Sequence, residues 1–300
     1  MRDLLNLLNK LSKLDLSSYP VNDAIRYINQ IGTQAGISYT LNKDFPIFRT
    51  RPNEDDFEVF NTRSQLSYKP QEFNTTFQRA STPNKTMFYG SILPPEYGED
   101  DINSARLTST LEASKTYRNN LFKSNEKVTF SRWEAKADIK LFVVLPVTKN
   151  DRSDSFTKFM NEELIKYMHS SKELSIKTRL TNQFFGNVFS NPNIRFDYDY
   201  IISAIYSELI INSGFEGLLY PSVKAQGKGY NVCLTPDCVD TKLKLKIAGE
   251  GRVLKVGYQS TVVGEKQAII TDDSKTFDYE LLDTYKDPKI IIDELYKEYS

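Results

Sequence analysis

Hydrophobic and polar positions follow two different patterns along the chain. Within residues 2–38, apolar side chains recur at helical spacing, which predicts two amphipathic helices. One stripe comprises Leu4, Leu5, Leu8 and Leu11, and the other comprises Ile25, Tyr27 and Ile28. The two helices form either an appendage or a helix pair packed on the rest of the protein.

From Phe45 onward, short apolar runs typical of strands take over. These runs lie at 46–51, 85–93, 127–135, 138–147, 240–248 and 251–260. Helical patterns occur at about 103–118, 155–169, 197–212 and 288–299, and the third of these ends at a cap signal, Ser213-Gly214. The mixture predicts an α+β fold with a mixed, mainly antiparallel sheet.

The chain length of 300 residues suits one large domain with an appendage. We expect an N-terminal helical extension at 1–40, a main domain at 41–260 and a C-terminal strand and helix tail at 261–300. Within the main domain, Trp133 and Arg132 are expected to be core and surface neighbours on one strand.

Residues 214–234 hold two apolar runs on either side of a loop of glycine, lysine and glutamine. We interpret Leu218 to Tyr220 as a buried central strand that ends in Pro221 and Ser222. A strand that opens into a flexible loop in this way commonly presents a hydroxyl at a pocket wall. The same letters also describe an ordinary hairpin, in which Ser222 caps the turn after Pro221.

Charge and hydropathy exclude several classes of partner. Lysine and arginine total 39, as do aspartate and glutamate, so no global field attracts nucleic acid or an anionic membrane. No apolar run approaches the roughly 18 residues that a membrane span needs. Asn6, Asn9 and Lys10 interrupt the N-terminal leucines, unlike the core of a signal peptide, so we expect a cytoplasmic protein.

The scarcity of histidine and cysteine limits the chemistry. His169 is the only histidine, and it lies near the end of an expected helix. This position favours a solvated side chain or one that interacts with the helix dipole. A single histidine also excludes zinc sites built on several histidines. A serine triad would have to use it, and no Gly-x-Ser-x-Gly motif is present. Cys233 and Cys238 flank a turn and are interpreted as packing residues. We therefore expect no metal, and chemistry that rests on Arg, Glu, Tyr and Ser.

Arginines near the strand edges are the first candidates. Arg49 and Arg51 alternate with Phe48 and Thr50, so one face of that strand carries both guanidinium groups. Two such groups repel each other unless an anion or a carboxylate lies between them. Arg79 precedes a turn in a later segment. The plain alternative for each arginine is a surface salt bridge.

A glutamate and a series of short motifs complete the pattern. Glu112 lies on the apolar side of an expected helix, where a carboxylate is either paired or functional. Taken in order, the segments FRTR, FQRASTPNKTMFYGS, LEAS, VTFSRW, GFEGLLYPSV and GYNVCL resemble the RES-domain family, which is named for its arginine, glutamate and serine. The resemblance covers about residues 45–234.

The resemblance implies a fold similar to ADP-ribosyltransferases and a cleft that binds NAD as a substrate. It also implies a bacterial toxin of a toxin–antitoxin pair, or an antiphage effector, that depletes NAD by hydrolysis or phosphorolysis, with a possible antitoxin protein as partner. The alternatives are ADP-ribosylation of a protein target and a non-catalytic nucleotide-binding protein whose N-terminal helices bind a partner.

Carried over motif by motif, the family's site falls on Arg49 with Arg51 as the close alternative, Arg79, Tyr89, Glu112 and Ser222. The arginines would bind the two phosphates, because guanidinium groups match phosphate oxygens in bidentate geometry. Glu112 would stabilise the oxocarbenium-like ribose, and Ser222 would contact that ribose or the amide. Tyr89 would contact nicotinamide or ribose, or else be a core aromatic with its hydroxyl at the surface. A longer stretch before Glu112 leaves Glu96 and Glu99 as rivals for the acid.

Overall fold

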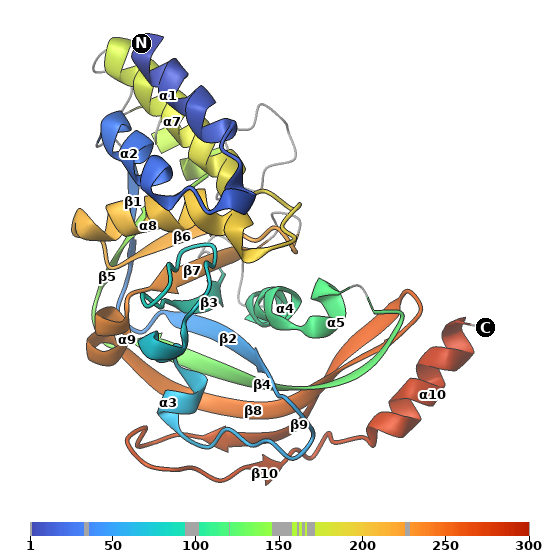
Figure 1. Cartoon of the computed structure of the whole chain (residues 1–300). Helices are drawn as coiled ribbons and strands as arrows, with labels where there is room; N and C mark the ends of the chain where they lie inside the picture. The colour runs from blue at the N-terminus through green and yellow to red at the C-terminus, as the bar shows by residue number, and fades with distance from the viewer. Residues whose placement is uncertain are drawn as a thin grey trace.

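The computed structural model describes residues 2–32, 36–93, 102–119, 121–145, 158–160, 162–163, 166, 172–225 and 229–299. In this part of the chain, ten strands form one sheet in the order β1-β5-β6-β7-β3-β2-β4-β8-β9-β10 (Figure 1). They are β1 Ile37–Leu41, β2 Pro46–Pro52, β3 Phe88–Ile92, β4 Lys123–Ala135, β5 Ile139–Val143, β6 Gly217–Pro221, β7 Tyr230–Leu234, β8 Leu243–Val256, β9 Gln259–Ile269 and β10 Glu280–Leu281. Neighbouring strands are antiparallel except β5 and β6, which confirms the expected α+β class and mixed sheet.

Helices gather mainly at one end of the sheet, where α1, α2, α7 and α8 lie together, while α4 and α5 lie over its middle (Figure 1). The helices are α1 Arg2–Ser12, α2 Val21–Ile31, α3 Arg63–Leu66, α4 Ile102–Ala113, α5 Lys115–Arg118, α7 Lys172–Phe189, α8 Ile201–Asn212, α9 Pro236–Lys242 and α10 Pro288–Tyr299, with short 3-10 turns η1 Leu16–Ser18, η2 Gln71–Phe73 and η4 Asp197–Tyr200. None of the helices in the described residues has the length and hydrophobicity needed to span a bilayer.

The helix expected at 103–118 is divided in two at Ser114. The carboxylate of Glu126 on β4 accepts hydrogen bonds from the Ser114 hydroxyl and from the backbone N–H groups of Lys115 and Thr116. A carboxylate in this position satisfies the free N–H groups at the start of a helix, so α5 begins as a separate element. The division leaves Glu112 in the last turn of α4.

The helical pattern near residues 155–189 was only partly recognised. Most of the expected helix at 155–169, including His169, lies outside the described residues. The long helix α7 at Lys172–Phe189 was not predicted. Its inward positions include Thr178 and Thr181, both fully buried, so its apolar stripe is weak in the sequence.

The N-terminal helices pack on the domain. Leu4, Leu8 and Leu11 share one buried cluster with Ile28 of α2 and Ile201 of α8. Of the two alternatives that the sequence left open, the structure shows the helix pair packed on the rest of the protein. Leu5 and Ile25 were wrongly assigned to the stripes, because the side chains of both are exposed. Each lies next to the buried face of its helix, where buried residues recur three or four positions apart.

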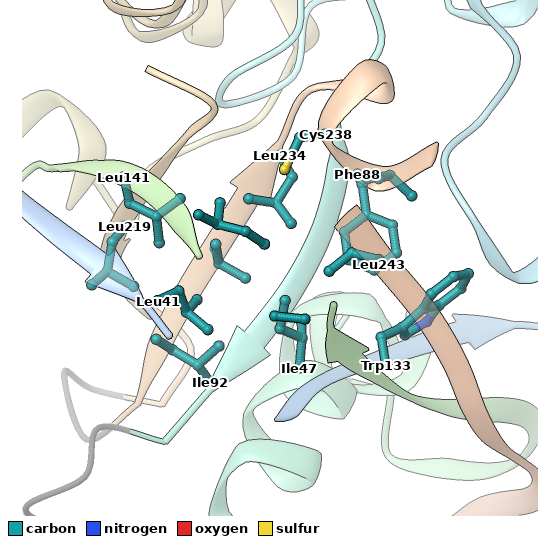
Figure 2. Packing of buried hydrophobic residues seen from close by; sticks show 14 of the residues in the cluster. Leu41, Ile47, Phe88, Ile92, Trp133, Leu141, Leu219, Leu234, Cys238 and Leu243 are labelled. Carbon is teal, nitrogen blue, oxygen red and sulfur yellow. The ribbon is translucent and has the colours of Figure 1, made fainter. Parts of the chain in front are cut away.

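The sheet is buried on both faces at β6. Leu218 and Tyr220 pack in the cluster with the N-terminal helices, while Leu219 packs in the opposite core, which Figure 2 shows together with Trp133. Arg132, next to Trp133, forms an ion pair with Glu134. The predictions of a buried strand at 218–220 and of a core tryptophan beside a surface arginine are confirmed.

Cys233 and Cys238 are both buried and unbonded to each other. Burial raises the pKa of each thiol to about 12, so both remain protonated at neutral pH. Figure 2 places Cys238 against the core that contains Phe88 and Leu243. The interpretation of the two cysteines as packing residues is confirmed.

Candidate active site

An open cleft of about 650 Å³ lies where the central strands β2, β3 and β7 approach α4. This volume falls within the roughly 300–1,000 Å³ of small-molecule sites. Five residues expected from the sequence line it: Arg49, Arg51, Arg79, Tyr89 and Glu112. Ser222, the sixth, is 1% exposed, is not among the lining residues and donates a hydrogen bond to Glu112. Glu96 and Glu99 lie outside the described residues.

The Glu112 carboxylate is held by two donors on one oxygen. The Ser222 hydroxyl donates to Oε1 at 2.6 Å, and the Asn231 side-chain amide donates to the same atom at 3.0 Å. Ser91 on β3 donates to the Asn231 carbonyl oxygen at 3.1 Å, which turns the amide N–H groups of Asn231 toward Glu112. Among the described residues no donor reaches Oε2.

Contacts between α4 and the sheet bring Glu112 to this position. The Thr50 hydroxyl on β2 lies 2.7 Å from the Ser109 hydroxyl and 3.2 Å from that of Thr110. Both α4 residues are buried, so the pairing fixes the helix against β2. The carboxylate of Glu112 follows one turn later on the same helix.

Ser222 is placed by the turn that ends β6. Its backbone N–H donates to the Gly229 carbonyl at 2.7 Å, and the Ala225 N–H donates to its hydroxyl at 3.0 Å. The hydroxyl thus caps the turn, as in the plain alternative, and also donates to Glu112, while a contact of Ser222 with a ligand stays a prediction. A Cβ at Gly229 would lie 2.2 Å from the Thr108 hydroxyl, so glycine allows the loop to pass close to α4.

Arg49 reaches from β2 to β3. The two strands are paired through Phe48 and Ser91, and beyond this pair the Arg49 guanidinium donates to the Tyr89 carbonyl at 2.5 Å. Its charge lies 5.0 Å from the centre of the Phe88 ring, and its buried Nε has no hydrogen-bond partner among the described residues. Burial, with a smaller contribution from the Arg51 charge, lowers the pKa of Arg49 to about 10. Its charge is therefore poorly compensated in the free protein.

Arg51 and Arg79 are held by other parts of the chain. Arg51 donates to the Gln65 carbonyl in α3 and lies 4.3 Å from the centre of the Phe60 ring. Arg79 donates to the Phe189 carbonyl at the end of α7. Within the described residues, Arg49, Arg51 and Arg79 form no ion pair, and all three line the cleft.

Tyr89 is hydrogen-bonded through its hydroxyl to the turn that follows Arg79. The hydroxyl accepts from the Ala80 N–H at 3.1 Å and lies 2.7 Å from the Ser81 hydroxyl. Burial raises the pKa of Tyr89, so the phenol stays neutral. The alternative of a hydroxyl at the surface is wrong, and Tyr89 positions the Arg79 segment beside the cleft.

Sequence reasoning missed Asn231 as a site residue. Every position of β7 is buried, and Asn231 is the polar one among apolar neighbours. A buried amide needs hydrogen-bond partners, and the position of Asn231 in the GYNVCL segment was the available signal. The exposed side chains of Arg195 and Lys224, which also line the cleft, were missed too.

Comparisons with known proteins add little to this geometry. No family model matches the chain, and no curated protein matches it. Among solved structures, the crystal structure of the MbcT–MbcA toxin–antitoxin complex of M. tuberculosis aligns with 80% of this chain and 91% of the matched chain, at 9% identity and a TM-score of 0.32. At this level of similarity, the function of the chain must rest on its own site.

Proposed function

We propose that this protein cleaves the bond between nicotinamide and ribose in NAD, and that it thereby depletes NAD as a bacterial toxin or antiphage effector. One observation carries the proposal. Glu112 is held on Oε1 by Ser222 and Asn231, and among the described residues its Oε2 accepts no hydrogen bond and the arginines that line the cleft form no ion pair.

The carboxylate suits the proposed bond cleavage. Nicotinamide leaves as a neutral molecule from a positively charged glycoside, so the reaction needs no general acid. Positive charge develops on the ribose in the transition state, and a fixed carboxylate stabilises it. Because Ser222 and Asn231 orient the carboxylate beforehand, little reorganisation is needed when that charge forms.

The charge of the cleft suits a dinucleotide. Its basic lining residues are Arg49, Arg51, Arg79, Arg195 and Lys224, and its acidic ones are Glu112 and Asp197. A diphosphate would supply the anions that the arginines lack, through bidentate hydrogen bonds. We assign Arg49 as the first phosphate ligand in preference to Arg51, because Arg49 extends to β3 while Arg51 is held at α3.

The test is the release of nicotinamide from NAD by the purified protein, followed by liquid chromatography. Glu112→Gln serves as the matched inactive variant. ADP-ribose, ADP-ribose 1″-phosphate or a modified protein as the second product would identify water, phosphate or a side chain as the acceptor. Binding of NAD without any release of nicotinamide would refute the enzyme and leave a nucleotide-binding protein.

A further inference from the structure

An exposed aromatic side chain stands at the cleft, outside the group of residues around Glu112. Phe196 precedes η4, lines the cleft and is 57% exposed. Exposure of an apolar ring to water is unfavourable, and a planar ligand group that covered the ring would remove this cost. The surrounding contacts decide whether the ring is held firmly enough to serve as such a site.

The backbone around Phe196 is fixed by a single carboxylate. Asp199 Oδ2 accepts hydrogen bonds from the N–H groups of Arg195 and Phe196 at 2.9 and 3.0 Å. The Phe196 ring is stacked on Tyr198, with centroids 5.0 Å apart and planes inclined by 24°. Phe196 is nevertheless 57% exposed, so much of its ring remains accessible to a second planar group.

The N-terminal segment supports this arrangement. Tyr19, just after η1, packs edge-on against Tyr198 with centroids 5.8 Å apart. Its hydroxyl donates to Asp197 Oδ1 at 2.6 Å, so Tyr19 is joined to η4 by both its ring and its hydroxyl. Tyr19 has a φ of 52°, a left-handed conformation that is uncommon for this residue type. The segment between α1 and α2 therefore reaches the rim of the cleft.

Arg79 connects this rim to the arginines. Its guanidinium lies 5.3 Å from the centre of the Tyr200 ring in η4, and it lines the same cleft as Glu112. An aromatic ring next to a cation that binds phosphate suits a nucleotide, because one ribose separates the base from the phosphate. Since Glu112 would contact the ribose that bears nicotinamide, the base at this rim would be adenine, the second base of NAD.

We propose that Phe196 is a stacking platform for the adenine base of the dinucleotide, and that Tyr19 is a positioning residue that holds the platform in place. The assignment of the base to the adenine of NAD rests on the proposed function. The stacking site itself is independent of that function, because any purine nucleotide could bind there. The N-terminal helices thereby contribute to ligand binding.

The experiment is isothermal titration of the full-length protein with 5′-AMP and, separately, with ribose 5-phosphate. Phe196→Ala should raise the Kd for AMP about tenfold or more, the usual effect of losing an aromatic stacking partner, and leave the Kd for ribose 5-phosphate unchanged. Phe196→Trp should restore AMP binding to within about threefold of the wild type. Tyr19→Phe should raise the Kd for AMP about threefold, the effect of one hydrogen bond.

Phe122→Ala is the matched control, because Phe122 is 63% exposed and is not a cleft residue. The platform is refuted if Phe196→Ala binds AMP like the wild type, if both ligands weaken equally, or if the wild type does not bind AMP. NAD cleavage is assayed in parallel. Cleavage with an unchanged KM for NAD in Phe196→Ala overturns the platform alone, whereas AMP binding that depends on Phe196 without cleavage overturns the proposed function alone.

Discussion

The Ser222 hydroxyl lies 2.6 Å from Oε1 of Glu112, although the two residues are 110 positions apart in the chain. The contact joins the end of β6 to the last turn of α4. Asn231 on β7 donates to the same oxygen, so sheet and helix together set the direction of the carboxylate. The proposed activity depends on this arrangement, because a charge that stabilises a transition state must be in place before the reaction.

Glu112→Gln should lower kcat for NAD cleavage by roughly 100- to 1,000-fold and leave the KM nearly unchanged. Glutamine keeps the shape of the side chain but loses the charge that acts in the transition state. The measurement is steady-state release of nicotinamide. Glu96→Gln and Glu99→Gln should retain full activity, and loss of activity in one of these with retention in Glu112→Gln would move the acid to the preceding stretch.

Ser222→Ala and Asn231→Ala should each lower kcat by roughly tenfold to 100-fold, the range of one hydrogen bond to a charged group. Because both side chains orient the same oxygen, the loss in the double variant should be smaller than the product of the two single losses. Adding Ser222→Ala to Glu112→Gln should have little further effect on the rate. Fully multiplicative losses would show that Ser222 and Asn231 act independently of Glu112.

Arg49→Met should weaken NAD binding by about tenfold or more while the melting temperature of the free protein stays equal or rises. Burial lowers the pKa of Arg49 from its ordinary value to about 10, so its burial opposes folding at any pH below 10. Above pH 10 the unfolded chain still holds the proton that the folded chain loses, so this penalty shrinks as pH rises toward the ordinary pKa of arginine.

The matched control for Arg49 is Arg132→Met, since Arg132 has an ion pair with Glu134. This variant should bind NAD like the wild type. Calorimetric titration gives the affinities and thermal unfolding gives the stabilities. A large loss of stability in Arg49→Met, with NAD affinity retained, would show that Arg49 has a structural role and does not bind phosphate.

Gly229→Ala should destabilise the fold by about 1–3 kcal/mol, because the new Cβ would lie 2.2 Å from the Thr108 hydroxyl. Relief of this clash moves the loop away from α4 and separates Ser222 from Glu112, so kcat should fall as well. Adding Thr108→Ala should restore part of both losses, as urea unfolding and nicotinamide release will measure. An active, fully stable Gly229→Ala protein would contradict the close packing of this loop on α4.

Local patterns predicted many elements of the fold correctly. The predicted alternation along β2 is present in the structure. Thr50 contacts Ser109 on α4, whereas Arg49 and Arg51 donate to backbone carbonyls of β3 and α3. The helix that ends before Gly214 was found because a glycine with a φ of 98° is a common helix terminator. By contrast, α7 was missed, because buried threonines give no hydrophobic signal.

The sequence by itself determined which residue types were available for chemistry, which strands were buried, and the short motifs on which Arg49, Arg79, Glu112 and Ser222 were selected. These features depend on side chains a few positions apart, so a local pattern contains them. Only the tertiary structure decided that Arg49 extends to β3, that Asn231 shares Oε1 of Glu112 with Ser222, and that Tyr19 supports the rim at Phe196. Each of these contacts joins segments far apart in the chain, and their positions follow from strand pairing and helix packing, which no short stretch of sequence specifies.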